Sequence, residues 1–253
     1  MNFISEIEEL KKLKNPPKKL YYKGNLKLLK SPKIAIVGSR KMTVYTKNLV
    51  FSLASKLKNA GVVVVSGGAL GVDIVAHEGA YPNTIGVFAN GLNIYYPQTN
   101  RQMIEKIYQN SLALSAYDPD EVARKYYFLE RNKIVVALSS ALVVAQAALD
   151  SGSMRSAKYA LELGIPIYVL PQKMFESDGT NYLLANNKAR LIYNIDEFIK
   201  ELGFNKKSIS DPLLADIEKN GDFDTLYEKF GEKLFWYELE GKIAIDGNRV
   251  IVL

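Results

Sequence analysis

The strongest constraint on this sequence is a regular alternation between short β-branched runs and amphipathic stretches of helical length. The runs KIAIVG and VVVV occupy 33–38 and 62–65, and an amphipathic stretch over 43–60 separates them. Short apolar runs of this kind are typical of strands buried on both faces. Connections of helical length between such strands predict a doubly wound, mostly parallel α/β sheet. Further strands are expected at 84–89, 112–115, 141–147, 165–171 and 190–194, and further helices at 100–109, 132–138, 154–163 and 195–202.

The chain divides into four segments by composition. The first is basic: nine lysines and no acid lie between 10 and 33. Two proline positions interrupt it, which favours a short helix followed by irregular, solvated chain. The expected segments are a short basic N-terminal segment at 1–32, a Rossmann-like domain at 33–203, a linker at 204–210 and a winged-helix-like domain at 211–253.

The C-terminal segment carries clear signals of local structure. Asp211-Pro212 fits an N-cap followed by proline at the first helical position. Two further helical stretches are expected around 223–230 and 232–240. The last two β-branched runs are joined at Asp246-Gly247-Asn248, which predicts a hairpin. Three short helices followed by a hairpin are typical of a winged-helix module.

Composition excludes several classes of protein. No stretch approaches the roughly 20 apolar residues of a membrane span, and the N-terminus lacks the apolar core of a signal peptide, so we expect a cytoplasmic protein. The chain has no cysteine and a single histidine, His77, which excludes thiolate sites and zinc sites with two histidines. The turn GSRKMT departs from the dinucleotide fingerprint, and no P-loop motif occurs. We therefore expect no cofactor and no metal.

Small and polar residues cluster at the carboxyl ends of the expected strands, where open parallel sheets bind ligands. Glycines at such turns let backbone N–H groups approach an anion, and the following helix N-terminus favours negative charge. Four such turns, two of them with arginine, predict an oxyanion-binding pocket. They are Val37-Gly38-Ser39-Arg40, Ser66 to Asp73, Ser151 to Arg155 and Asp178-Gly179-Thr180-Asn181.

Six short motifs occur in an order that one known family shares. They are V-G-S-R at 37–40, S-G-G-A-L-G-V-D-x-x-A-H at 66–77, Y-P at 96–97, R-N at 131–132, S-G-S at 151–153 and G-T-N-Y-L-L at 179–184. Over about 33–203 the chain closely resembles the DNA-processing protein A (DprA, or Smf) family. The resemblance implies an extended Rossmann fold and a homodimer. It also implies a single-stranded DNA-binding protein that protects incoming DNA and loads the RecA recombinase during natural transformation.

The sequence departs from the family pattern at three places. The third turn continues Met154-Arg155-Ser156, where the family more often has threonine at the last position, so Ser156 keeps the hydroxyl. Gln172-Lys173 stands where glycine is usual, which adds a cation. The roughly 30 residues before the first expected strand leave no room for the N-terminal helical domain of longer members, so we do not carry over the function of that domain.

Individual residues are assigned by their chemistry. Arg40 has no packing role at the end of a buried strand, so we expect it to bind a phosphate. Arg131 and Lys133 lie at the expected start of a helix, where cations are unfavourable unless they face an anion. Phe128 is the best candidate for base stacking, ahead of Tyr45, Tyr95, Tyr96, Tyr126 and Tyr127. The expected DNA-binding residues are Gly38, Ser39, Arg40, Ser66, Gly67, Gly68, Ala69, Phe128, Arg131, Asn132, Lys133, Ser151, Gly152, Ser153, Arg155, Lys173 and Asn181.

Asp73 and His77 are four residues apart, on one face of an expected helix. A catalytic histidine needs a nucleophile and an orienting partner, and the sequence offers no such set. We therefore predict a structural Asp73–His77 pair that positions the glycine loop.

The function that these residues favour is non-enzymatic, sequence-tolerant binding of single-stranded DNA through phosphate contacts and base stacking. One alternative is an enzyme of the nucleotide N-glycosidase type, because related Rossmann folds hydrolyse such bonds with a P-G-G-x-G-T-x-x-E signature. The nearest matches here, SGGALGVD and SGSMRSAKY, lack its glutamate. A second alternative is a protein that binds small nucleotides.

The C-terminal segment differs in charge from the rest of the chain. From 204 to 253 there are seven lysines and arginines against ten acids, whereas 1–203 holds 26 against 17. Duplex binding needs positive charge at the phosphates. Trp236, the only tryptophan, lies beside Phe235 and Tyr237, so we expect an outward-facing aromatic of the kind found at protein contacts. We predict that this module docks a protein, which is the partner subunit, the same chain's body or a competence factor.

Overall fold

The structure is a computed structural model that describes residues 2–204 and 211–252. The chain forms two compact units, 1–205 and 206–253. The linker expected at 204–210 lies outside the described residues, except for Phe204. Each unit is described by itself.

A nine-stranded sheet forms the centre of the first unit, with the order β1-β2-β6-β5-β4-β3-β7-β8-β9. The seven strands from β3 onward pair in parallel, with registers such as Ile34↔Val64 and Ile36↔Val143. The chain runs from β3 towards β6 on one side and returns through β7 on the other, which confirms the expected doubly wound fold. The strands are β1 Phe3–Ile4, β2 Leu20–Gly24, β3 Lys33–Val37, β4 Val63–Ser66, β5 Thr84–Phe88, β6 Leu112–Ser115, β7 Ala141–Val144, β8 Ile167–Val169 and β9 Arg190–Leu191.

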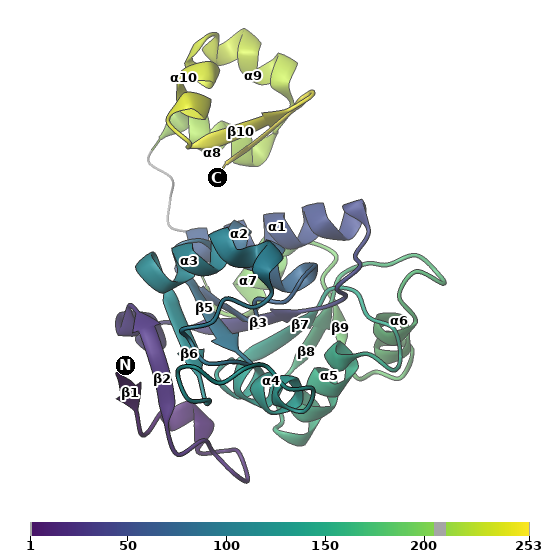
Figure 1. Cartoon of the computed structure of the whole chain (residues 1–253). Coiled ribbons are helices and arrows are strands. Elements are labelled where there is room, and N and C mark those ends of the chain that lie inside the picture. The colour runs from purple at the N-terminus through teal and green to yellow at the C-terminus, as the bar shows by residue number, and fades with distance from the viewer. Residues whose placement is uncertain (1, 205–210, 253) are drawn as a thin grey trace. The chain divides into compact units, whose positions relative to one another are not determined.

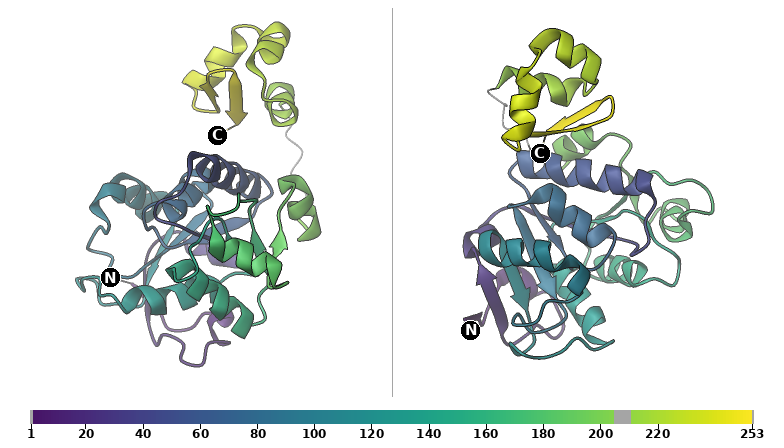
Figure 2. Two further views of the ribbon diagram at one scale, coloured as in Figure 1. Left: turned by 90° about the vertical axis from the view of Figure 1, so that its right-hand side faces the viewer. Right: turned by 45° about the horizontal axis from the view of Figure 1, so that its top comes forward.

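Helices cover both faces of this sheet. Figure 1 and the two views of Figure 2 show α1, α2, α3 and α7 on one face, and α4 and α5 on the other. Over 2–204 and 211–252, no helix is long and apolar enough to cross a membrane. The helices of this unit are α1 Val44–Asn59, α2 Val72–Ala80, α3 Arg101–Asn110, α4 Tyr127–Ala137, α5 Gly152–Glu162, α6 Asp178–Ala185 and α7 Ile195–Glu201, with short 3₁₀ turns η1 Glu8–Leu10, η2 Leu26–Lys30 and η3 Gln98–Asn100.

The sheet is buried on both faces because successive side chains of a strand point to opposite sides. On β3, Ile34 and Ile36 pack with residues of α1, α2 and α7, while Ala35 and Val37 pack with residues of α4 and α5. All four of these side chains are buried. Strands in this position read as continuous apolar runs, which is why the sequence pattern located them.

The N-terminal segment forms part of the sheet. β2 pairs antiparallel with β6, with Tyr22 opposite Leu114, and β1 pairs with β2 at the outer edge. The expectation of a short helix and irregular chain is therefore wrong for 20–24. The strand LYYKG is five residues long, lies among lysines and is the second strand of the sheet, because the two-residue strand β1 occupies the edge.

The second unit contains three helices and a terminal hairpin, in the order expected from the sequence. Its small core contains Leu213, Leu226 and Leu234. The Asp211 carboxylate caps the first helix by accepting hydrogen bonds from the N–H groups of Leu213 and Leu214. The elements are α8 Pro212–Lys219, α9 Phe223–Phe230, α10 Lys233–Leu239, β10 Ile243–Asp246 and β11 Arg249–Val252.

Candidate functional site

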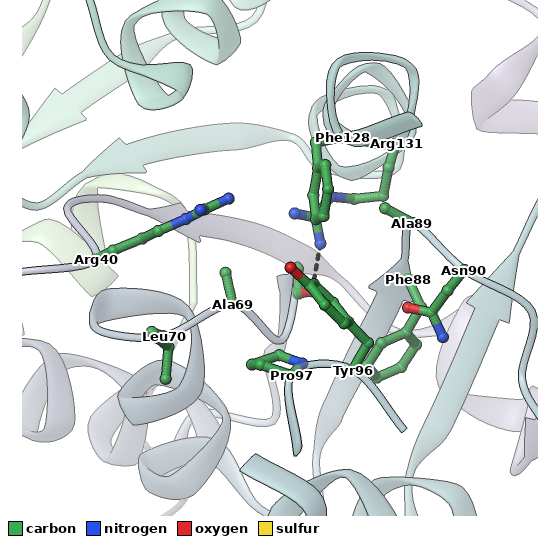
Figure 3. A pocket seen from close by; sticks show the side chains of 11 residues that line it. Arg40, Ala69, Leu70, Phe88, Ala89, Asn90, Tyr96, Pro97, Phe128 and Arg131 are labelled. Carbon is green, nitrogen blue, oxygen red and sulfur yellow. Dashed lines mark hydrogen bonds between the residues drawn. The ribbon is translucent and has the colours of Figure 1, made fainter. Parts of the chain in front are cut away.

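A pocket opens at the carboxyl ends of β3, β4 and β5, the edge at which parallel α/β sheets bind ligands. Arg40 follows β3, and Gly67 and Ala69 follow β4. Phe128 and Arg131 reach the pocket from the first two turns of α4. The lining residues are Arg40, Gly67, Ala69, Leu70, Phe88, Ala89, Asn90, Tyr96, Pro97, Phe128 and Arg131. We call this hollow the Arg40–Phe128 pocket (Figure 3).

Among the residues that line the pocket, the Arg40 guanidinium lies beside the aromatic rings of Phe128 and Tyr96. The Arg40 guanidinium carbon lies 5.6 Å from the centre of the Phe128 ring, and the Phe128 and Tyr96 rings lie 5.9 Å apart. Figure 3 shows the Arg40 side chain extending towards Phe128 and Arg131. Arg40 and Tyr96 are exposed, and Arg40 forms no ion pair in the part of the chain that the structure describes. The pocket therefore offers a free positive charge beside aromatic faces.

Arg131 has a different role, because its guanidinium is buried with 4% of the residue exposed. Its Nη1 donates to the carbonyl oxygens of Gly67 and Val87, the second at 2.8 Å. Its Nε donates to Asn132 Oδ1 at 3.0 Å. The side chain thus ties α4 to the ends of β4 and β5. Arg131 lines the pocket. We expected it to contact DNA, but its Nε and Nη1 donors bind the protein itself.

Asp73, in the first turn of α2, supports the same loop. It is buried, and burial raises the pKa of its carboxyl group, while the positive charge of Arg131 and the N–H groups of Ala69 and Gly67 lower it. The N–H groups of Gly67 and Ala69 therefore lie close to the Asp73 carboxyl group. The glycine at 67 is required for a steric reason, because a Cβ there would lie 2.0 Å from Arg131 Nη1.

The expected Asp73–His77 pair is not formed. The His77 side chain is buried between α2 and the sheet. Its Nδ1 lies 2.6 Å from Thr84 Oγ1. The Thr84 hydroxyl donates to the Val64 carbonyl at 2.8 Å, so the imidazole Nδ1–H donates to Thr84. Burial lowers the pKa of His77 to about 3. His77 is a neutral structural residue that joins α2 to β4 and β5, and Asp73 faces the loop instead.

The expectation that Lys133 lies at the start of a helix is wrong, because α4 begins at Tyr127 rather than near 132. Lys133 therefore lies within the helix and not at its N-terminus. Its Nζ pairs with Glu130 Oε1 at 2.8 Å and lies 5.4 Å from the Tyr159 ring. It lines a separate hollow, between α4 and the N-terminal segment. Five residues of a helix separate Phe128 from Lys133, which places them on different faces.

The third and fourth turns follow β7 and β8 but do not line the Arg40–Phe128 pocket. The Ser151 hydroxyl caps α5 by accepting the N–H of Met154. Arg155 is exposed on the first turn of α5, whereas Ser153 is buried. Gly152 and Asn181 bond to other residues with an expected role in DNA binding. Asn132 Nδ2 donates to the Gly152 carbonyl, and Asn181 Nδ2 donates to the Lys173 carbonyl. The Lys173 ammonium lies 3.9 Å from Glu176.

Several assigned polar groups are already bonded within the chain. The Ser66 hydroxyl donates to the Ile36 carbonyl at 2.6 Å, and the Ser39 hydroxyl bonds to the backbone of Lys41. Gly38 packs so closely that a Cβ would lie 2.6 Å from the Val72 side chain. Gly68 has a φ of +68°, in the region that favours glycine, and its carbonyl accepts from Asn100. These residues shape the pocket, while Arg40, Phe128 and Tyr96 present side chains to it.

Sequence reasoning missed the contribution of the loop after β5. Phe88, Ala89 and Asn90 line the pocket, and Asn90 holds the loop by donating to the carbonyls of Gly91 and Ile94. Asn90-Gly91 directly follows a strand that the sequence pattern located at 84–89, so the rule applied to the other strand ends identifies this one too. Leu70 and Pro97 also line the pocket; Leu70 belongs to the expected turn from Ser66 to Asp73 and Pro97 to the Y-P motif.

The side chains that line the Arg40–Phe128 pocket are cationic, aromatic, amide or apolar. None of its lining residues carries a carboxylate or an imidazole. Within 2–204 and 211–252, no three His, Cys, Asp or Glu side chains lie close enough to hold a metal ion together. A guanidinium beside aromatic faces is the combination that holds a phosphate and a stacked base.

The chain is similar to known proteins in both sequence and structure. The model of the family "DNA recombination-mediator protein A" matches residues 6–203. The chain is 35% identical over 201 residues to the DNA processing protein DprA of Streptococcus pneumoniae, covering 78% of this chain and 71% of that protein. The structure of DNA processing protein A from Helicobacter pylori, described for its single-stranded DNA binding mode, superposes with a TM-score of 0.79 at 46% identity, covering 81% of this chain and 97% of that one. The chain belongs to the DNA recombination-mediator protein A (DprA) family.

Proposed function

We propose that this protein binds single-stranded DNA in the Arg40–Phe128 pocket, without sequence preference and without catalysing a reaction. The observation that carries the proposal is the exposed Arg40 guanidinium, 5.6 Å from the Phe128 ring and free of any ion pair within the described residues. An arginine that is unpaired in the protein is available to a phosphate. Every base has a π-face, so stacking on Phe128 or Tyr96 tolerates any sequence.

The relatives support a role in recombination. The family is that of a recombination mediator, and the Helicobacter pylori protein binds single-stranded DNA. We propose that this protein acts as a cytoplasmic homodimer that protects incoming single strands and delivers them to the RecA recombinase during natural transformation. Delivery requires binding that is firm but sequence-tolerant, and phosphate contacts with stacking supply that combination.

An N-glycosidase function is less well supported. Such an enzyme needs carboxylates beside the scissile bond, as glycoside hydrolysis generally does. Asp73 is buried against the backbone of the Gly67 to Ala69 loop and does not line the pocket. His77 does not line it either and is hydrogen-bonded to Thr84. Incubation with nucleoside monophosphates tests this alternative, and we expect no release of base. A small-nucleotide binder would hold mononucleotides as tightly as oligonucleotides, whereas we expect affinity to rise with strand length.

We further propose that the C-terminal unit docks a protein rather than duplex DNA. Trp236 is 63% exposed and Leu239 is 80% exposed on α10, and Phe235 is exposed beside them. The unit carries an excess of acids, which removes the general attraction to phosphates. Exposed tryptophan and neighbouring apolar side chains are typical of protein interfaces.

The proposed DNA binding is tested by titrating fluorescein-labelled oligo(dT) with wild type, Arg40→Ala and Lys30→Ala at several salt concentrations. Lys30 is exposed, lies on η2 and does not line the pocket, so it controls for the loss of one charge. We expect Arg40→Ala to weaken binding and to reduce the salt slope by roughly 0.7, the contribution of one phosphate on a single strand. Equal affinities and slopes for the two variants would reject the assignment.

A further inference from the structure

A second hollow lies between the N-terminal segment and α4. It is lined by Lys18, Lys19 and Tyr21 from the N-terminal segment, Tyr117 from the loop after β6, and Tyr126 and Tyr127 at the start of α4. We call it the tyrosine–lysine groove. It contains two lysines of the basic stretch at 10–33, for which neither the fold nor the Arg40–Phe128 pocket provides a role.

The tyrosines of the groove form a supported aromatic surface. The Tyr117 and Tyr127 rings stack at 3.8 Å with 24° between their planes, and Tyr126 meets Tyr127 edge-on at 4.5 Å. The Tyr117 hydroxyl donates to the Tyr127 carbonyl, and the Tyr127 hydroxyl donates to Glu121. Tyr117 and Tyr127 are thus held by packing. Tyr126, at 55% exposed, presents its ring outward.

The charges of the groove leave two cations available. Of its two acids, Glu130 pairs with Lys133 at 2.8 Å, and Asp118 accepts the hydroxyl of Tyr21 at 2.8 Å. Asp118 keeps its negative charge, and Lys18 and Lys19 together outweigh it by one positive charge. Lys18 and Lys19 are exposed and have no ion pair in the described part of the chain, and Lys19 lies 4.9 Å from the Phe3 ring. Lysines at the rim of an aromatic surface form the pattern that binds single-stranded nucleic acid.

The groove and the Arg40–Phe128 pocket flank the same two turns of α4. Phe128 and Arg131 line the pocket, whereas Tyr127, Glu130 and Lys133 line the groove. A helix with its side chains is about 10 Å across, which is the length of about three nucleotides at the spacing of one DNA strand. A strand that leaves the pocket across the start of α4 therefore reaches Tyr126 within a few nucleotides.

We propose that the tyrosine–lysine groove binds the continuation of the single strand held in the Arg40–Phe128 pocket. A base stacks on Tyr126, and phosphates contact Lys18 and Lys19. This inference rests on the proposed function, and it extends the binding site from one side of α4 to the other. It assigns the basic N-terminal segment to DNA binding in addition to its place at the edge of the sheet.

The test compares a short and a long strand, fluorescein-labelled dT6 and dT15, in anisotropy titrations. The variants are Lys18→Ala/Lys19→Ala and Tyr126→Ala. Lys27→Ala/Lys30→Ala removes the same charge from the same segment outside the groove. Tyr193→Ala removes a tyrosine that is 74% exposed and lines neither site. Thermal melts confirm that all four variants are folded, and Arg40→Ala reports on the pocket.

For dT15, we expect Tyr126→Ala to weaken binding at least about fivefold, because one stacked base contributes that much or more. Lys18→Ala/Lys19→Ala should also weaken binding and reduce the salt slope by about 1.4, since two phosphates are lost. For dT6, which has few nucleotides beyond those in the pocket, both groove variants should lose less affinity than for dT15. Both controls should stay within about twofold of wild type for either strand.

Two results separate the inference from the function on which it rests. If Arg40→Ala weakens dT6 but the groove variants lower dT15 affinity no more than their controls, the groove does not bind DNA and the pocket assignment stands. If Arg40→Ala leaves dT6 binding unchanged, the proposed function itself fails. Equal losses for dT6 and dT15 in the groove variants would also overturn the inference, because they would show an effect on the pocket.

Discussion

Replacing Arg131 with methionine tests whether Arg131 stabilises the fold around the pocket, as distinct from binding DNA. Methionine keeps an unbranched apolar stem of similar length and removes every donor. The carbonyl oxygens of Gly67 and Val87 then lose their buried partner, and Asn132 loses the Nε–H of the guanidinium. The buried Asp73 carboxyl also loses the nearby positive charge that lowers its pKa.

The magnitude follows from these contacts. A buried polar group left without a partner costs about 1–3 kcal/mol, and two carbonyls are affected. Methionine relieves the desolvation of a buried cation, which offsets part of this loss. Breaking a buried charged network by removing one member typically costs about 3–5 kcal/mol. At about 2–4 °C for each kcal/mol in a unit of this size, we expect the Tm to fall by roughly 6–20 °C.

The assay is thermal denaturation followed by two probes, because two units need not unfold together. Trp236, the only tryptophan, reports on the C-terminal unit, and far-UV circular dichroism reports mainly on the larger one. The matched control is Arg40→Met, which removes an exposed arginine of the same pocket and should change stability by no more than about 0.5 kcal/mol. Equal stability of the two variants would refute the structural role of Arg131.

Three further outcomes are expected. Gly67→Ala should destabilise the fold by about 1–3 kcal/mol, because its Cβ would lie 2.0 Å from Arg131 Nη1; an unchanged melting temperature would contradict this contact. Burial keeps His77 neutral with a pKa of about 3, whereas the unfolded imidazole takes up a proton below about pH 6.5, so stability is lost as pH falls through this window. Wild type should lose about 2 kcal/mol more than His77→Gln between pH 7 and pH 5, and parallel pH profiles would count against a buried neutral imidazole. A chain ending at 207 should keep its affinity for single-stranded DNA within about threefold, a change under ~0.7 kcal/mol; a larger loss, or micromolar binding of duplex DNA that depends on 208–253, would show that the C-terminal unit contacts DNA.

The sequence located the central strands because burial on both faces leaves an unmistakable apolar run. It missed β2 because this five-residue antiparallel strand carries tyrosine and lysine in place of such a run. It misplaced the start of α4 because Tyr126 gives no side-chain cap and the first turn contains aromatic residues, so no capping signal stands there. Because of that error, Lys133 was expected at the N-terminus of the helix, whereas it lies in its second turn.

The sequence predicted the edge of the sheet at which the pocket lies, but not the side-chain contacts within it. The rule that ligands bind at the carboxyl ends of parallel strands located Arg40, Gly67 and Ala69. Packing between distant segments decides which arginine is available to a ligand. Arg131 donates to the carbonyls of Gly67 and Val87, which are 64 and 44 residues away in the sequence. In the same way, His77 bonds to Thr84 across the sheet rather than to its helical neighbour Asp73. Spacing along one helix carries no information about such contacts.

The most direct test of DNA binding in the Arg40–Phe128 pocket is photo-crosslinking with oligo(dT) that contains 5-iododeoxyuridine, followed by mass spectrometry of the linked peptides. Iodouracil reacts with the aromatic ring on which it stacks. We expect cross-links at Phe128 or Tyr96, whose rings lie 5.9 Å apart in the pocket, and we expect Arg40→Ala to reduce their yield. Cross-links confined to residues outside the pocket, with a yield that Arg40→Ala leaves unchanged, would contradict the assignment of the DNA site.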